Sequence, residues 1–226
     1  MSSAEDKKQI LAEHKVIPNV LPDNIDLPHG MTLKWPNATL DTPAQELDCD
    51  ETQPEPKIYL HPPPSDPLDN LVLIMTDPDL MMIDDTYFGQ VRHWLVTNLS
   101  SNADGSLSFS HAAARSPYIG PAPLPNYVYP RLHRYIFILA RGVSKVEVTP
   151  DDLRELQKPH AAAMTGKQGM VQDLKDRWGF NAQALIEKKR LEVVAANFML
   201  VGGTLKSAAA NLSMMSQAVA DKIIGR

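Results

Sequence analysis

Residues Leu71 to Leu99 read LVLIMTDPDLMMIDDTYFGQVRHWLVTNL, and residues Tyr118 to Arg141 read YIGPAPLPNYVYPRLHRYIFILAR. Each stretch holds an apolar, strand-like run with polar side chains set into it. Burying a histidine or a carboxylate without a partner costs about 1–3 kcal/mol, so such a group usually has a partner or a function. The polar groups that stand out in these two runs are Asp77, Asp79, His93 and His133.

Alternation predicts which side chains share a face of each strand, because residues i, i+2 and i+4 of a strand point the same way. In the first strand the face of His93 carries Val91, His93, Leu95 and Thr97. In the second strand the face of His133 carries His133, Tyr135, Phe137 and Leu139. Both strands are apolar on both faces near their middles, which is typical of inner strands of a sandwich. If the two strands are neighbours, both imidazoles open into one cavity at the rim.

Four motifs follow one another between residues 77 and 135: Asp77-Pro78-Asp79, Arg92-His93-Trp94, Gly120-Pro121-Ala122-Pro123 and His133-Arg134-Tyr135. This succession resembles the phosphatidylethanolamine-binding protein (PEBP) family, which includes the Raf kinase inhibitor proteins and the carboxypeptidase Y inhibitors. The likeness extends to Val194–Phe198, which is similar to a late strand of the family. The chain departs from the family pattern at Met81, Arg92, Ala122 and Leu124.

The resemblance implies a mainly β protein, a Greek-key β-sandwich with a few peripheral helices. It implies a small pocket for phosphate or another anion, and roles in lipid-headgroup binding, kinase regulation or inhibition of a serine carboxypeptidase. No catalytic residue, metal or cofactor is implied. Transferred motif by motif, the ligand-binding residues are Asp77, Asp79, His93, Gly120, Pro121, Ala122, Pro123, His133 and Tyr135.

Composition narrows the class of protein. The chain has 226 residues, of which 43% are hydrophobic and 22% charged, as in ordinary globular proteins. A net charge of −5 without a basic stripe argues against nucleic acid as a partner. Cys49 is the only cysteine, so no internal disulfide forms, and a reducing compartment is expected. With no signal-peptide core and no membrane-spanning run, we expect a cytoplasmic protein without integral membrane association.

Three segments are expected along the chain. Residues 1–17 form an N-terminal helical arm that starts near Ser3 and ends before Pro18. This arm either packs on the sheet or detaches to engage a partner protein. Residues 18–201 form the sandwich domain. Residues 202–226 carry an apolar stripe at helical spacing, which predicts a C-terminal helix packed on the domain or extending from it.

Other elements follow from local patterns. Strands are predicted at residues 31–35, 57–61, 146–148 and 191–201. Thr149 followed by Pro150 predicts the start of a helix, and a second helix is expected over residues 181–190. In the proline-rich loop that ends at Pro130, the N–H groups of Gly120 and Ala122 are candidate donors to an anion.

The polar cluster allows several kinds of chemistry. Two histidines and two carboxylates could ligate a metal, or Asp77 and His133 could act as an acid–base pair. The two aspartates could also merely cap a turn. Binding is the preferred interpretation: charged His93 and His133 donate to phosphate oxygens while Asp77 orients one ring. It predicts that phosphate binds more weakly as pH rises from about 6 to about 8.

The function predicted from the sequence is therefore that of a non-enzymatic binding protein. Its ligand is a phosphorylated small molecule or a phospholipid headgroup. It regulates or inhibits a protein partner, either a serine carboxypeptidase or a signalling kinase. The alternative is a small-molecule enzyme that uses Asp77, His93 and His133 as an acid–base or metal site.

Overall fold

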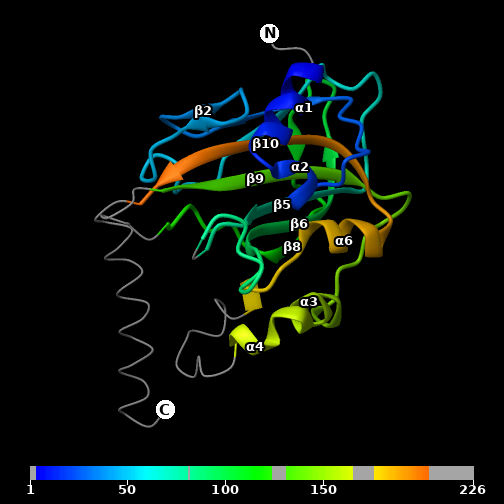
Figure 1. Cartoon of the computed structure of the whole chain (residues 1–226). Coiled ribbons are helices and arrows are strands. Elements are labelled where there is room, and N and C mark those ends of the chain that lie inside the picture. Colours follow the sequence, from blue (N-terminus) through cyan, green and yellow to red (C-terminus); the bar gives the residue numbers. More distant parts are fainter. Residues whose placement is uncertain (1–3, 81, 124–130, 165–175, 204–226) are drawn as a thin grey trace, which may run out of the picture.

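The computed structural model describes residues 4–80, 82–123, 131–164 and 176–203 (Figure 1). Its helices are α1 (Ala4–Glu13), α2 (Val16–Asn19), α3 (Pro150–Gln157), the 3-10 helix η1 (Lys158–His160), α4 (Ala161–Met164) and α6 (Ala182–Lys189). Its strands are β1 (Gly30–Lys34), β2 (Thr39–Leu40), β3 (Gln45–Glu46), β4 (Lys57–His61), β5 (Leu71–Asp77), β6 (Val91–Ser101), β7 (Leu107–Ser108), β8 (Ala113–Ser116), β9 (Leu132–Arg141) and β10 (Glu192–Gly202).

The strands form two sheets. A three-stranded sheet has the order β2-β1-β4, and a seven-stranded sheet has the order β3-β10-β9-β5-β6-β7, with β8 paired to β6. The long strands β5, β6, β9 and β10 pair antiparallel, whereas the short β3 runs parallel to its neighbour β10. The predicted mainly β fold is confirmed.

Strand β9 shows why the large sheet is buried on both faces. Phe137 and Leu139 pack into the apolar layer between the two sheets, whereas Ile136 and Ile138 pack into a second layer under the helices. The face predicted for Tyr135, Phe137 and Leu139 is therefore confirmed. Alternation in a strand with two apolar faces places it inside the molecule, as its complete burial from His133 to Ala140 shows.

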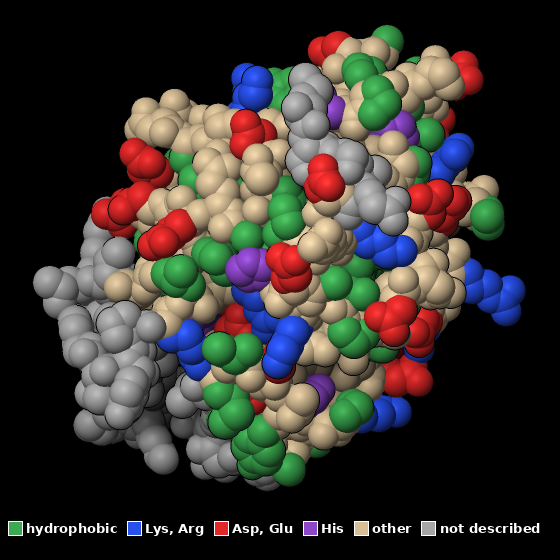
Figure 2. All heavy atoms as spheres, turned by 45° about the horizontal axis from the view of Figure 1, so that its top comes forward, with side chains coloured by type: hydrophobic (Ala, Val, Ile, Leu, Met, Phe, Trp, Pro, Cys, Tyr) green, Lys and Arg blue, Asp and Glu red, His purple; other side chains and the backbone are tan. Residues whose placement is uncertain are grey.

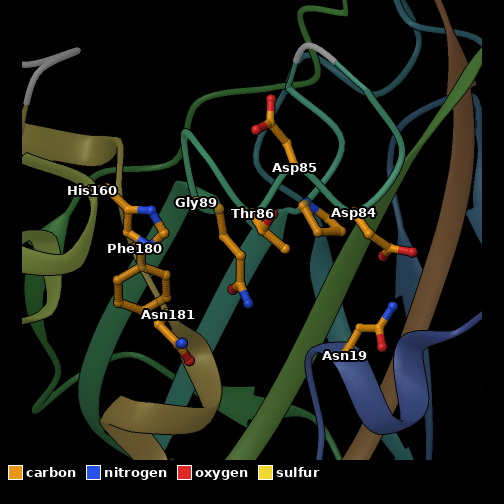
Figure 3. A pocket seen from close by; sticks show the side chains of 10 residues that line it. Asn19, Asp84, Asp85, Thr86, Gly89, His160, Phe180 and Asn181 are labelled. Carbon is orange, nitrogen blue, oxygen red and sulfur yellow. The ribbon is translucent and has the colours of Figure 1, made fainter. Parts of the chain in front are cut away.

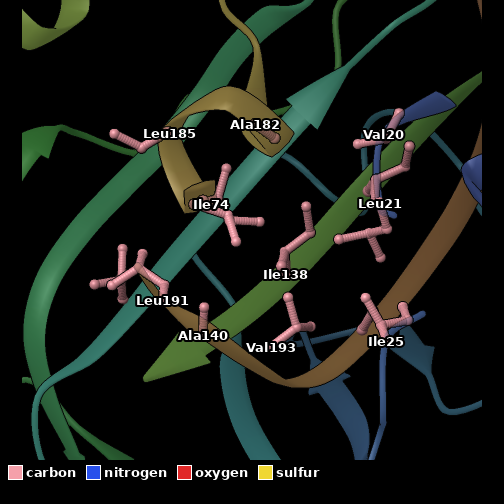
Figure 4. Packing of buried hydrophobic residues seen from close by; sticks show 14 of the residues in the cluster. Val20, Leu21, Ile25, Ile74, Ile138, Ala140, Ala182, Leu185, Leu191 and Val193 are labelled. Atoms are coloured by element: carbon pink, nitrogen blue, oxygen red, sulfur yellow. The ribbon is translucent and has the colours of Figure 1, made fainter. Parts of the chain in front are cut away.

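Helices cover the outer face of the large sheet. Leu185 of α6 and Ala182 pack against Ile74 of β5 and Ile138 of β9, and the segment containing Val20 joins the same layer (Figure 4). Leu11 of α1 and Leu156 of α3 belong to this layer as well: the first helix is therefore packed on the sheet in this structure.

Helix ends follow the sequence signals. Thr149 accepts a hydrogen bond from the backbone N–H of Asp152, and the Asp152 side chain accepts one from the N–H of Thr149, which together make a capping box. Asn181 caps α6 through the N–H of Ala184. The predicted strand at residues 146–148 is wrong: Val146 and Val148 are buried, but no strand partner pairs with them. The predicted C-terminal helix falls largely on residues 204–226, which lie outside the described residues.

Two expectations about the histidine strands are corrected. Strands β6 and β9 are not neighbours, because β5 lies between them. The regular alternation expected around His93 is broken as well: Met75 pairs with Trp94 and Thr76 with Arg92, so a β-bulge falls at His93. A bulge adds one residue to a strand and turns a side chain to the other face. His93 therefore does not share the face of Leu95.

Candidate functional site

Asp77 ends the central strand β5 and forms the centre of the site. Its Oδ2 lies 2.9 Å from Nδ1 of His133, and its Oδ1 accepts the backbone N–H of Asp79 at 2.7 Å. Both side chains are almost completely buried. Burial by itself raises the pKa of Asp77, but the interaction of its carboxylate with the His133 ring outweighs burial and holds the pKa below its ordinary value. The carboxylate is therefore ionised at neutral pH.

The other ring nitrogen of His133 faces an arginine. Nε2 lies 2.9 Å from Nη2 of Arg131, and the guanidinium group has donors only. Nε2 must therefore accept, which places the proton on Nδ1, where it is donated to Asp77. This assigns His133 as the neutral tautomer. The sequence analysis expected instead a charged ring that donates from Nε2 to a ligand.

The bulge at His93 turns its ring toward Tyr135. The two rings meet edge to face with centroids 5.0 Å apart, and Nδ1 of His93 donates to the carbonyl of Ile119 at 3.0 Å. Burial lowers the pKa of His93, and the charge of Asp77 only partly offsets this. The expected charged form of His93 is therefore disfavoured.

The loop from Gly120 to Pro123 closes over this cluster. The N–H of Ala122 donates to the hydroxyl of Tyr135 at 3.2 Å, and the carbonyl of Pro121 accepts from Nε2 of Gln53 at 2.7 Å. A side chain at Gly120 would place its Cβ 2.8 Å from the Cα of Gln53, so only glycine fits there. Of the two N–H groups predicted as anion donors, that of Ala122 is thus engaged by Tyr135.

Asp79 lies in a separate network. Its Oδ2 accepts from Nε of Arg134 at 2.8 Å, and its Oδ1 accepts from Nη2 of Arg134 at 2.5 Å. The same arginine contacts Asp84 and donates to the carbonyl of His14 at 2.7 Å. Asp79 is completely buried, and only its backbone bonds to the first cluster, through the N–H that Asp77 accepts and the carbonyl that accepts from Arg131. The structure therefore brings together Asp77, His93, His133, Tyr135 and the loop, and leaves the side chain of Asp79 outside that group.

Sequence analysis missed Arg131. A signal was present, because Arg131 stands two residues before His133, the spacing at which side chains share a face if the extended backbone continues beyond the start of β9. It also missed a cavity of about 290 Å³ beside the turn that follows β5, with Asp84 in its wall (Figure 3). No motif marks this cavity, since its walls come from separate segments that include Asn19, Asp84, Asp85, His160 and Phe180.

Two further findings concern metals and membranes. Within the described ranges, no three histidine, cysteine or acidic side chains gather closely enough to hold a metal ion. No helix in the part of the chain that the structure describes is both long enough and apolar enough to cross a membrane.

Acidic and basic side chains are interspersed on the face that Figure 2 shows, with no basic patch on that face.

Comparisons with known proteins bear on the family and the fold. The family model "Phosphatidylethanolamine-binding protein" matches residues 23–177. The uncharacterized protein YLR179C of Saccharomyces cerevisiae is 26% identical over 169 residues, which are 70% of this chain and 74% of that protein. CEN-like protein 1 of Nicotiana tabacum is 30% identical over 83 residues, which are 37% of this chain and 42% of that protein.

Solved structures share the fold. A carboxypeptidase Y inhibitor, in a complex with its cognate proteinase, superposes with a TM-score of 0.62 at 17% identity, over 89% of this chain and 97% of that one. A phosphatidylethanolamine-binding protein from Plasmodium vivax superposes with a TM-score of 0.59 at 19% identity, over 88% and 98% of the two chains. Because the family model covers more than half of the sequence and the fold agrees, this chain belongs to the phosphatidylethanolamine-binding protein family.

Proposed function

We propose that this protein is a non-enzymatic binding protein that holds a phosphate-type anion at the mouth formed by β5, β6 and β9, and that regulates a protein partner. The ligand is a phosphorylated small molecule or a phospholipid headgroup. The observation that carries the proposal is the convergence of Asp77, His93, His133 and Tyr135 under the Gly120–Pro123 loop, on strands with the order β9-β5-β6.

The internal bonds of the cluster favour binding over acid–base catalysis. A general base needs a nitrogen within hydrogen-bond reach of the substrate proton. Nδ1 of His133 faces Asp77 and Nε2 faces Arg131, so neither nitrogen is open to a substrate. Nδ1 of His93 is held by Ile119. This arrangement preorganises a site, and a preorganised site loses little entropy when a ligand binds.

Titration calorimetry tests whether the proposed pocket binds a phosphate-type anion. Inorganic phosphate and phosphoethanolamine are titrated into the full chain, and we expect saturable binding with one site for each chain. Tyr135→Phe is the matched variant: it removes only the hydroxyl that accepts from Ala122, and so loosens the loop while the ring stays in place. Absence of binding by the wild-type protein would overturn the proposed ligand class.

A serine carboxypeptidase is the partner that we propose first. The support is the fold shared with a carboxypeptidase Y inhibitor, together with the N-terminal helix, which offers a surface beside the sheet. Removing residues 1–17 is a poor test, because the buried Leu11, Val16 and Ile17 would be lost with them. A substitution on the exposed face of α1 leaves the core intact.

The partner assay therefore compares three full-length proteins. Wild type, Ala12→Arg and the exposed control Thr86→Arg are tested for inhibition of a purified serine carboxypeptidase. We expect the wild-type protein to inhibit, Ala12→Arg to lose most of that inhibition, and Thr86→Arg to keep it. Inhibition by all three proteins would exclude α1 as the contact. If none inhibits the peptidase, a signalling kinase is the next partner to assay.

A further inference from the structure

Arg131 lies where the buried cluster reaches the surface. His133, Tyr135 and Asp77 are buried, whereas Arg131 is partly exposed and directly precedes β9. Its Nη2 donates to the carbonyl of Asp79 at 2.8 Å and to Nε2 of His133 at 2.9 Å, with the carbonyl of Leu80 at 3.3 Å. Of these four residues Arg131 is the one that is not buried, so we expect an anion in solvent to meet it first.

The charge of Arg131 is not matched by a carboxylate. Its partners among the described residues are two carbonyls and a neutral imidazole, and none of the ion pairs found there includes it. Its Nε is buried and has no acceptor among the described residues. A buried donor without an acceptor is costly, and a donor that carries positive charge prefers an anionic oxygen.

A chain of hydrogen bonds fixes this guanidinium group. Asp77 accepts from Nδ1 of His133, which leaves the lone pair of Nε2 free to accept from Arg131. Carboxylate–histidine pairs orient metal ligands in the same way, by setting the tautomer of the ring. His133 is thus a positioning residue in this arrangement, and Arg131 is the group that meets the ligand.

We propose that Arg131 is the specificity-determining residue of the anion pocket: it binds a phosphate- or sulfate-type oxyanion with its Nε, a donor that no described residue engages, while Asp77 and His133 hold the guanidinium group in place. This inference rests on the anion pocket proposed above and names the group that provides its charge. Because arginine stays protonated at all physiological pH values, the positive charge of the site does not depend on the titration of a histidine.

Sulfate is the sharpest probe, because it remains a dianion throughout the range in which imidazoles titrate. Calorimetric titrations compare wild type, Arg131→Gln, Arg131→Lys and Arg141→Gln. The last variant removes the same charge from the exposed far end of β9. We expect Arg131→Gln to weaken sulfate binding about 10- to 100-fold, the loss of one charged hydrogen bond. Arg131→Lys should lose less, and Arg141→Gln should match the wild type.

The pH profile distinguishes Arg131 from the histidines. Wild-type affinity for sulfate should stay within about twofold between about pH 6 and about pH 8. In Arg131→Gln, Nε2 of His133 no longer faces a cation. The groups that face this ring are Asp77, Tyr135, Arg131 and, at longer range, His93.

Each outcome decides one question. Steep pH dependence in the wild type, or equal affinity of wild type and Arg131→Gln, overturns the role of Arg131 and leaves the pocket itself standing. No binding of sulfate, phosphate or phosphoethanolamine by the wild type overturns the proposed function as well. Urea unfolding of each variant shows that the fold is retained. Titration of glycerophosphoethanolamine beside phosphoethanolamine distinguishes a lipid headgroup from a free phosphate monoester.

Discussion

Asp77 and Asp79 are two residues apart, yet the structure gives them different surroundings. The side chain of Asp79 pairs with Arg134, which also contacts Asp84 and the carbonyl of His14. Asp77 pairs with a neutral His133, whose far side meets a guanidinium group with one donor, Nε, that no described residue engages. We call the network of Asp79 closed, because its acids and its arginine are paired with one another. We call the network of Asp77 open, because it leads through His133 to Arg131, which can bind a ligand. We therefore expect substitutions at Asp79 to affect mainly stability and substitutions at Asp77 to affect mainly the proposed binding.

The largest effect is expected from breaking the closed network. Arg134→Met leaves Asp79 buried without its cation, and removing one partner of a buried ion pair costs about 3–5 kcal/mol. Urea denaturation measures the free energy of unfolding. Arg131→Met is the control, because Arg131 is partly exposed and has no ion-pair partner in the described ranges, and it should lose far less. Similar losses in the two variants would contradict the division into a closed and an open network.

Asparagine substitutions at the two aspartates sharpen the comparison. Asp77→Asn keeps an oxygen for the N–H of Asp79 but removes the charge that His133 contacts, and we expect a loss of about 1–3 kcal/mol. The His133 ring then loses the bond that fixes its tautomer, so Arg131 is released and sulfate binding falls. Asp79→Asn should destabilise the protein more, because Arg134 loses a buried charge, and should change sulfate affinity less. Denaturation and calorimetry on the same two variants provide both measurements.

The sequence predicted the sheet better than it predicted the site. Alternation placed Tyr135 and Phe137 on one face and Ile136 on the other, and this prediction is confirmed because β9 is a regular strand. The same rule failed at His93, since a bulge adds a residue without a signal in side-chain pattern. The residues that the motifs selected mostly lie close together in the structure. The order of the strands, however, could not be derived from alternation alone.

The partner of Asp79 shows a second limit of sequence reasoning. Alternation had placed Arg134 on the face opposite His133, but nothing in the sequence joins that face to Asp79, which is 55 residues away along the chain. The protonation of the two histidines could not be predicted from the sequence either. It depends on burial at His93 and on Arg131 at His133, and both are properties of the folded chain.

The pH dependence of the free energy of unfolding tests His93, which lies in the cluster of Asp77. Its pKa is lowered in the folded protein, so below the unfolded value, about 6.5, the unfolded chain binds a proton that the native protein does not. The free energy of unfolding should therefore fall as pH drops from about 6.5, by at most about 1.4 kcal/mol per pH unit. His93→Gln can still donate to Ile119 and should remove this slope. An unchanged slope in the variant would place the titrating group elsewhere.

Asp84 gives the smallest effect and tests whether the closed network needs both of its acids. Burial opposes ionisation, but the hydrogen bond from Arg134 holds the pKa of Asp84 below its ordinary value. A lowered carboxyl pKa stabilises the native state above the unfolded value, about 3.9, and that contribution is lost as pH falls through the folded value. Because the side chain is partly exposed and Asp79 remains to hold Arg134, Asp84→Asn should cost only about 0.5–1 kcal/mol near neutral pH. The difference between wild type and variant should vanish in acid, and a loss as large as that of Arg134→Met would show that Asp84, rather than Asp79, is the main partner of the arginine.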